Sequence, residues 1–115
     1  MSSLKGTIKK LQTAINTKYQ QQLTYHTSQF YSKQKDNTVT RYTIKKAVYN
    51  PEKDKNQNIE LFGAYSPLQL VYFLRDYWYT LEGTEIPNDN EKWNKIKEDN
   101  HINYEEYIKL GVDNG

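Results

Sequence analysis

The sequence predicts an α+β domain: an N-terminal helix, a three-stranded antiparallel sheet, a core helix and short C-terminal helices, in the order α-β-β-β-α-α-α. Three observations predict it. Apolar residues recur at helical spacings of three and four in residues 3–22 and 66–82, whereas residues 23–49 are rich in β-branched and aromatic residues that favour strands. The length of 115 residues and the 36% share of hydrophobic residues provide for one modest core, so residues 1–115 are predicted to form a single domain.

The first predicted helix, residues 3–22, is amphipathic and begins with uncompensated positive charge. Its apolar stripe consists of Leu4, Ile8, Leu11, Ile15 and Tyr19. Its opening turns carry Lys5, Lys9 and Lys10 and no acidic residue, although the N-terminal end of a helix is the positive end of its dipole. A bound anion would relieve this arrangement, and a solvated surface helix fringed with lysines would tolerate it.

Residues 23–33 and 38–49 predict a β-hairpin, because the polar segment between them is typical of a turn. If residues 33 and 38 pair across the turn, alternation places one set of side chains on a core face: Tyr25, Thr27, Tyr31, Tyr42, Ile44 and Val48. The second set then forms a polar and basic surface: His26, Ser28, Phe30, Arg41, Thr43 and Lys45.

A loop, a third strand and the core helix follow. Residues 51–58 are loop-like in composition, and the short apolar run of residues 59–65 predicts a strand. Ser66 suits the N-cap of the next helix, Pro67 its first position and Gly83 its C-terminal stop, and a glutamine three residues after the cap is typical of a capping box. The buried face of this helix is predicted to hold Leu70, Phe73, Leu74, Tyr77 and Leu81.

The opposite side of the 66–82 helix is also apolar and needs a cover. The favoured cover is a helical extension of residues 84–115, which follows the core of residues 3–83 and brings Trp93, Ile96, Tyr104 and Tyr107. It would roof Leu68, Tyr72 and Tyr79. In the alternative, a protein-binding or homodimer interface is formed by Tyr72, Arg75 and Tyr79.

Charge is divided unevenly along the chain. Residues 1–50 hold nine basic residues and one acid, a net +8, whereas residues 51–115 hold seven basic and thirteen acidic residues, a net −6. The split indicates halves that attract each other, a basic half that faces a polyanion, or simply an uneven solvated surface. Thirty-five residues precede the first acid, Asp36, so pairing between sequence neighbours cannot neutralise the early lysines.

The composition excludes several kinds of chemistry. Without cysteine there is no disulfide, thiolate metal site or cysteine nucleophile. His26 and His101 lack further ligands at metal spacing, and no phosphate-binding loop motif occurs, so we expect no catalysis, no metal and no cofactor. The polar first 30 residues and the lack of a long apolar run predict a cytoplasmic protein. Abundant Lys, Asn, Ile and Tyr are typical of AT-rich genomes and suit a phage or mobile element.

The order helix, strand, strand, strand, helix in residues 3–83 resembles the topology of the double-stranded-RNA-binding domain. In that family the second helix begins with a lysine cluster that holds phosphates, whereas here it begins with Ser66, Pro67 and Leu68. The family's Gly-Pro-x-His loop motif is also absent. The resemblance is therefore limited to topology, and other α+β binding modules share the same order.

These patterns favour a small non-catalytic protein that binds nucleic acid, DNA more than RNA, as an accessory or regulatory factor. Phosphates would be contacted by Lys5, Lys9, Lys10, Arg41, Lys45 and Lys46, and bases by His26 and Phe30. The alternative is a protein-binding inhibitor or accessory subunit that uses a tyrosine-rich surface. Nucleic acid needs the lysines on one connected surface, whereas a protein partner needs a contiguous aromatic patch with few lysines at its centre.

Overall fold

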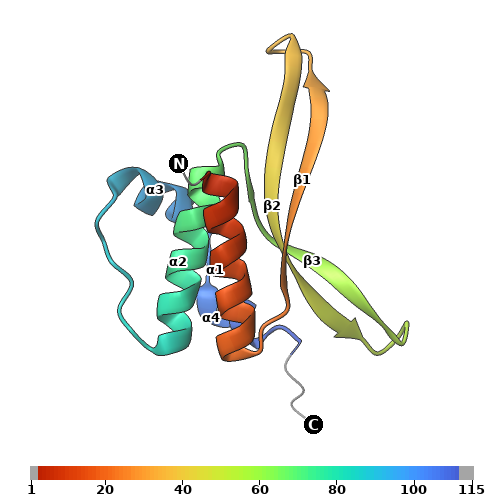
Figure 1. The fold of residues 1–115 in the computed structure, drawn as a ribbon, viewed down its shortest axis with the longest axis vertical. Coiled ribbons are helices and arrows are strands. Elements are labelled where there is room, and N and C mark those ends of the chain that lie inside the picture. Colours follow the sequence, from red (N-terminus) through yellow and green to blue (C-terminus); the bar gives the residue numbers. More distant parts are fainter. Residues whose placement is uncertain (1–2, 112–115) are drawn as a thin grey trace.

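A computed structural model describes residues 3–111 and confirms the predicted α+β class and element order (Figure 1). Four helices and three strands follow one another as α1 Leu4–Tyr19, β1 Leu23–Ser32, β2 Asn37–Asn50, β3 Lys55–Ala64, α2 Pro67–Glu82, α3 Glu91–Asp99 and α4 Tyr104–Lys109. Within the described residues, no helix is both long and apolar enough to cross a membrane.

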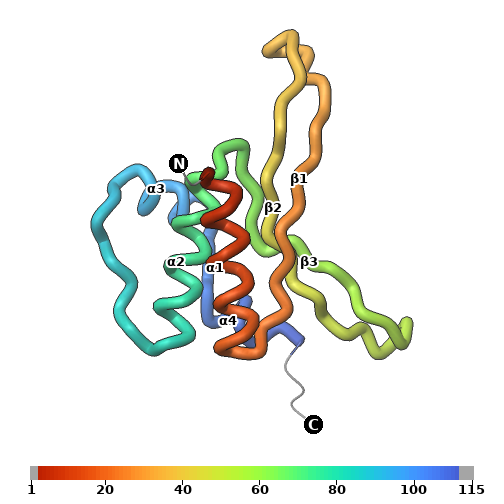
Figure 2. Tube along the Cα trace, in the orientation of Figure 1, coloured from red at the N-terminus to blue at the C-terminus, as the bar shows by residue number. Residues whose placement is uncertain are grey.

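The sheet is antiparallel with the order β1-β2-β3, and its central strand is much longer than the region where all three strands meet. Strand β1 pairs with residues 37–46 of β2, and β3 pairs with residues 42–50. Beyond the shared residues 42–46 the sheet continues as two diverging two-stranded ribbons (Figures 1 and 2). We call residues 26–41 the upper arm and residues 47–58 the lower arm.

The predicted pairing of residues 33 and 38 is wrong by two positions, because Ser32 pairs with Asn37. A shift of two keeps every side chain on its predicted face. The expectation that Thr27 and Tyr31 belong to the core is nevertheless wrong, since both are exposed where the upper arm runs past the helices. A bulge between β2 and β3 leaves Leu61 as an extra residue in β3.

Helices α1 and α2 lie side by side and parallel, and both pack on the same face of the sheet (Figure 1). The predicted apolar faces meet there in one buried cluster that includes Ile8, Ile15, Leu23, Ile44, Phe62, Leu70, Phe73, Leu74 and Tyr77. Two amides of α1 fix the start of β1: Gln12 Nε2 and Asn16 Nδ2 donate to the Leu23 carbonyl at 2.8 and 2.9 Å. These hydrogen bonds therefore set the position of the first residue of β1 relative to α1.

A buried carboxylate, Asp76 of α2, holds the C-terminal helices in place. Its Oδ2 accepts hydrogen bonds from Trp93 Nε1 at 2.8 Å and Lys97 Nζ at 3.0 Å, both on α3. The Tyr104 hydroxyl of α4 lies 3.4 Å from the same oxygen, and Arg75 Nε donates to Oδ1 at 3.0 Å. One fully buried acid thus joins α3 and α4 to the core helix.

The predicted cover over the second side of α2 is present over part of that side. Trp93 and Tyr104 are buried, and Trp93 stacks on Tyr72 with ring centroids 5.9 Å apart. Leu68 stays 45% exposed, and Tyr79 lines a surface hollow. The roof therefore covers the middle of α2 and leaves its first turn open.

The C-terminal ends of α1 and α2 are joined through Glu82, and this contact predicts a pH dependence. Lys18 Nζ and Trp78 Nε1 donate to the Glu82 carboxylate at 3.0 and 2.6 Å. The hydrogen bonds from Trp78 and then Lys18 lower the pKa of Glu82 to about 2. Because the pKa is depressed in the folded protein, ionised Glu82 stabilises the fold at pH values above the ordinary carboxyl pKa of 4.5. This contribution is lost as the pH falls towards 2.

We therefore expect the free energy of unfolding, measured by urea titration, to fall between about pH 5 and pH 2. Glu82→Gln should show a smaller fall. Glu85→Gln, at an exposed position nearby, should follow the wild-type curve. Identical pH curves for wild type and Glu82→Gln would show that this contact contributes nothing measurable.

Candidate nucleic-acid interface

The face of the sheet opposite the helices is uncovered within the described residues, and we call it the open face. Strand alternation determines which side chains it carries, because Tyr42 and Ile44 point into the core and their neighbours point away. From β1 and β2 it receives His26, Ser28, Phe30, Val39, Arg41, Thr43 and Lys45; from β3 and the residue after it, Glu60, Gly63 and Tyr65.

Arg41 is held on the open face by an ion pair and is not a free cation. Its Nη1 and Nη2 donate to the two carboxylate oxygens of Glu60 at 2.8 and 2.9 Å, and Nη1 also donates to the hydroxyl of buried Thr43 at 3.2 Å. The hydrogen bond raises the pKa of Arg41 and lowers that of Glu60. The guanidinium crosses Gly63, where an added Cβ would overlap it, so a side chain at this position would displace the Arg41 guanidinium.

An exposed aromatic pair on the open face joins Phe30 of the upper arm to Tyr65, the residue after β3. Phe30 and Tyr65 meet edge to face with ring centroids 6.1 Å apart, and they remain 43% and 60% exposed. They line a shallow hollow together with Ser32, Gln34, Lys35 and Val39. Two exposed rings beside a lysine form a surface on which flat, negatively charged ligands can stack.

Three further lysines lie on the open face or at the turn of the upper arm. Lys45 is half-buried on β2, opposite Glu60, and Lys33 and Lys35 are at the exposed turn. His26 lies between the aromatic pair and Lys45, exposed, with Nε2 2.9 Å from the Thr24 hydroxyl. No ion pair involving Lys33, Lys35 or Lys45 is found within residues 3–111. Lys33 and Lys35 are exposed, whereas Lys45 lies close enough to Glu60 for its charge to lower the pKa of that carboxyl.

The prediction that Lys46 contacts phosphates requires correction. Lys46 lies on the helix-covered side of β2 and is only 5% exposed. Its ammonium donates to the carbonyls of Tyr107 and Ile108 at 3.0 Å each, and burial lowers its pKa. This lysine closes the C-terminal end of α4 and is not available to a ligand.

The predicted lysines of α1 lie on a different surface from the open face. Lys5, Lys9 and Lys10 are exposed on α1, which belongs to the layer on the opposite side of the sheet (Figure 1). The structure therefore brings together His26, Phe30, Arg41 and Lys45 of the predicted set and leaves these three lysines apart from them.

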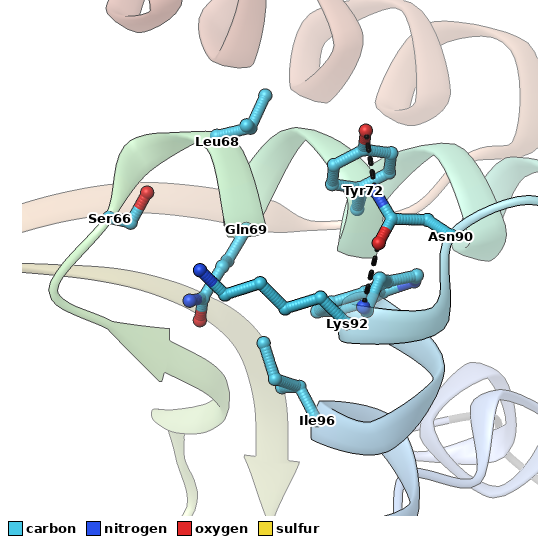
Figure 3. A pocket seen from close by; sticks show the side chains of 8 residues that line it. Ser66, Leu68, Gln69, Tyr72, Asn90, Lys92 and Ile96 are labelled. Carbon is cyan, nitrogen blue, oxygen red and sulfur yellow. Dashed lines mark hydrogen bonds between the residues drawn. The ribbon is translucent and has the colours of Figure 1, made fainter.

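Of the residues predicted for a protein interface, Tyr72 and Arg75 are engaged in contacts within the molecule, whereas Tyr79 lines a surface hollow. Asn90 Nδ2 donates to the Tyr72 hydroxyl at 3.1 Å, beside the cavity of about 90 Å³ between α2 and α3 (Figure 3). Arg75 lies over the Tyr72 ring at 5.0 Å and pairs with Asp76 and with Asp89. The contacts of Tyr72 and Arg75 stabilise the roof over α2. Tyr79 borders the hollow near the C-terminal end of α2 and takes no part in the roof.

Tyr65 and Lys35 were not among the predicted site residues. Tyr65 follows the last residue of β3 and precedes the helix cap, and the predicted third strand included it without assigning its side chain to either face of the sheet. Its spacing of two from Gly63 is the pattern that places it on the open face, once β3 is known to pair with β2.

Comparisons with known proteins give no assignment for this chain. No protein family model matches it, and no curated protein or solved structure matches it. In the part of the chain that the structure describes, no group of three or more His, Asp or Glu residues is placed to hold a metal ion.

Proposed function

We propose that this protein binds single-stranded nucleic acid on the open face of its sheet and holds it without chemical change. The observation that carries the proposal is the exposed Phe30–Tyr65 pair with Lys35 beside it, on the face that no helix of residues 3–111 covers. Aromatic rings on an open sheet bind unstacked bases, and nearby lysines bind the phosphates between them.

The distribution of charge supports this location on the molecule. Lys33, Lys35 and Lys45 are free of ion pairs within the described residues, and the one acid of the upper arm, Asp36, accepts a hydrogen bond from Tyr31 on the opposite side. A strand that crosses the arm would therefore meet positive charge at the turn and at the base of the arm. His26 and the rings lie between these two ends.

Single strands suit this surface better than a duplex does. Stacking on Phe30 or Tyr65 needs a base whose flat side is free, and in a duplex neighbouring bases cover those sides. Stacking on an aromatic side chain contributes about 1–3 kcal/mol per base and depends little on sequence.

A protein partner remains the second candidate, because Phe30, Val39 and Tyr65 also form a contiguous apolar patch with no lysine at its centre. Such a partner would bind the same rings without needing phosphate. Salt dependence separates the two candidates, since phosphate contacts release counterions and weaken as salt rises.

The test is fluorescence anisotropy with labelled single-stranded DNA and RNA and a labelled duplex, each at two salt concentrations. Wild type should bind single strands more tightly than duplex, and the affinity should fall with salt. Phe30→Ala combined with Tyr65→Ala should weaken binding by about tenfold or more, because two stacking surfaces are lost.

The matched control is Tyr31→Ala, which removes an equally exposed ring from the same strand on the opposite side. Its affinity should stay within about twofold of wild type. The proposal fails if the double variant keeps full affinity, if Tyr31→Ala weakens binding as much, or if wild type binds no nucleic acid at low salt.

A further inference from the structure

Strand β1 forms one edge of the sheet, and nothing described lies beside it along the upper arm. It pairs with β2 on one side only. Residues 26–31 are all exposed, and Figures 1 and 2 show the outer side of the arm open to solvent. A row of backbone N–H and C=O groups therefore faces outward from a straight, fully paired strand.

This edge lacks every feature that normally prevents a sheet from adding another strand. Edges are usually blocked by charged side chains, proline, bulges or short length. The ten residues Leu23–Ser32 contain no Lys, Arg, Asp, Glu or Pro, and their pairing with β2 runs without a bulge. They are rich in threonine and aromatic residues, which favour strand pairing.

The other edge of the same sheet, β3, is protected. It carries Lys55 and Glu60, and its pairing is interrupted at the bulge around Leu61. Two edges of one small sheet thus differ sharply. Of the two edges, β1 is therefore the one that can accept a partner strand.

We propose that the partner is a second copy of this chain, joined through antiparallel pairing of β1 with β1 across a twofold axis near Ser28. The strand is uncharged, so two copies bring no like charges into opposition. With Ser28 opposite Ser28, the register places Tyr25 opposite Tyr31 and His26 opposite Phe30 of the second copy, pairs of the kind that stabilise antiparallel strands.

The charges next to β1 agree with this register. Lys33 and Lys35 of the turn lie beyond the paired segment, and the register carries them towards the uncharged Gln20–Leu23 end of the other copy. With the axis perpendicular to the sheet, the two sheets form one continuous six-stranded sheet, and both open faces lie on the same side. The pairing itself does not depend on nucleic acid.

Sedimentation equilibrium of the full chain, without nucleic acid, tests the proposal. Wild type should approach twice the chain mass of 13.7 kDa at micromolar concentrations. Ser28→Lys combined with Gln29→Lys should raise the dimer dissociation constant at least tenfold, because lysines block strand addition at an edge. Asn56→Lys with Asn58→Lys adds the same charge to exposed positions of β3 and should leave the dimer unchanged.

A second measurement covers the case in which the lysine variant folds poorly. The chain has no cysteine, so Ser28→Cys should form a disulfide-linked dimer under mild oxidation, whereas Asn58→Cys should remain monomeric. The proposal is overturned if wild type stays monomeric at several hundred micromolar, if the Ser28 and Gln29 lysines do not weaken the dimer, or if Ser28→Cys links no faster than Asn58→Cys.

Discussion

Replacing Asp76 by alanine is expected to lower the free energy of unfolding by about 3–5 kcal/mol, because it removes one partner from a buried ionic network. The carboxylate is fully buried and accepts hydrogen bonds from Trp93 and Lys97. Without it the indole N–H and the ammonium lose their acceptor, and α3 loses its main polar attachment to α2. Urea unfolding followed by circular dichroism measures the change.

The control is Asp89→Ala. Asp89 also pairs with Arg75, but its side chain is mostly exposed, so its loss should cost less than about 1 kcal/mol. Equal effects of the two substitutions would show that the buried network does not hold the C-terminal helices.

Leu74→Ala is expected to lower the free energy of unfolding by about 2–5 kcal/mol, since it leaves a cavity where α2 meets the rest of the core. Leu74 is fully buried in the central apolar cluster. Leu68→Ala, the same change on the exposed first turn of the same helix, should cost less than about 1 kcal/mol. A Leu74→Ala protein as stable as Leu68→Ala would place the buried face of α2 elsewhere.

The sequence predicted the fold where local patterns decide it. Gly83 ends α2 in the left-handed conformation that glycine favours, and Pro67 begins it, as expected. The expected capping box is absent, because the Ser66 side chain makes no cap hydrogen bond. Alternation also assigned the strand faces correctly, since the two-residue error in register preserves them.

Features that depend on distant parts of the chain could not be predicted. Thr27 and Tyr31 are exposed because the upper arm extends beyond the ends of the helices (Figure 1). The sequence around these two residues carries no pattern that shows where the helices stop covering the strands. Lys46 is buried where the carbonyls of Tyr107 and Ile108 accept its hydrogen bonds, and these two residues lie about sixty positions further along the chain. The buried network of Arg75 and Asp76 could not be predicted either, because its other members, Trp93 and Lys97, lie 17 and 21 residues after Asp76 in the sequence.

The candidate site was likewise predictable only in its local part. The alternation of side chains along a strand was enough to place His26, Phe30 and Lys45 on one surface. The neutralisation of Arg41 was not foreseeable, because it depends on the bulge that brings Glu60 opposite Lys45 and on the space above Gly63. Tyr65 joined the site only through the pairing of β3 with β2.

Binding of single strands on the open face can be located by NMR chemical-shift mapping of the isotopically labelled protein, titrated with a short single-stranded oligonucleotide. We expect the largest shifts at Phe30, Tyr65 and Lys45 on the open face, with Lys5 and Lys9 of α1 nearly unchanged. Shifts centred on α1, or no shifts at a saturating oligonucleotide concentration at low salt, would show that the open face is not the binding surface.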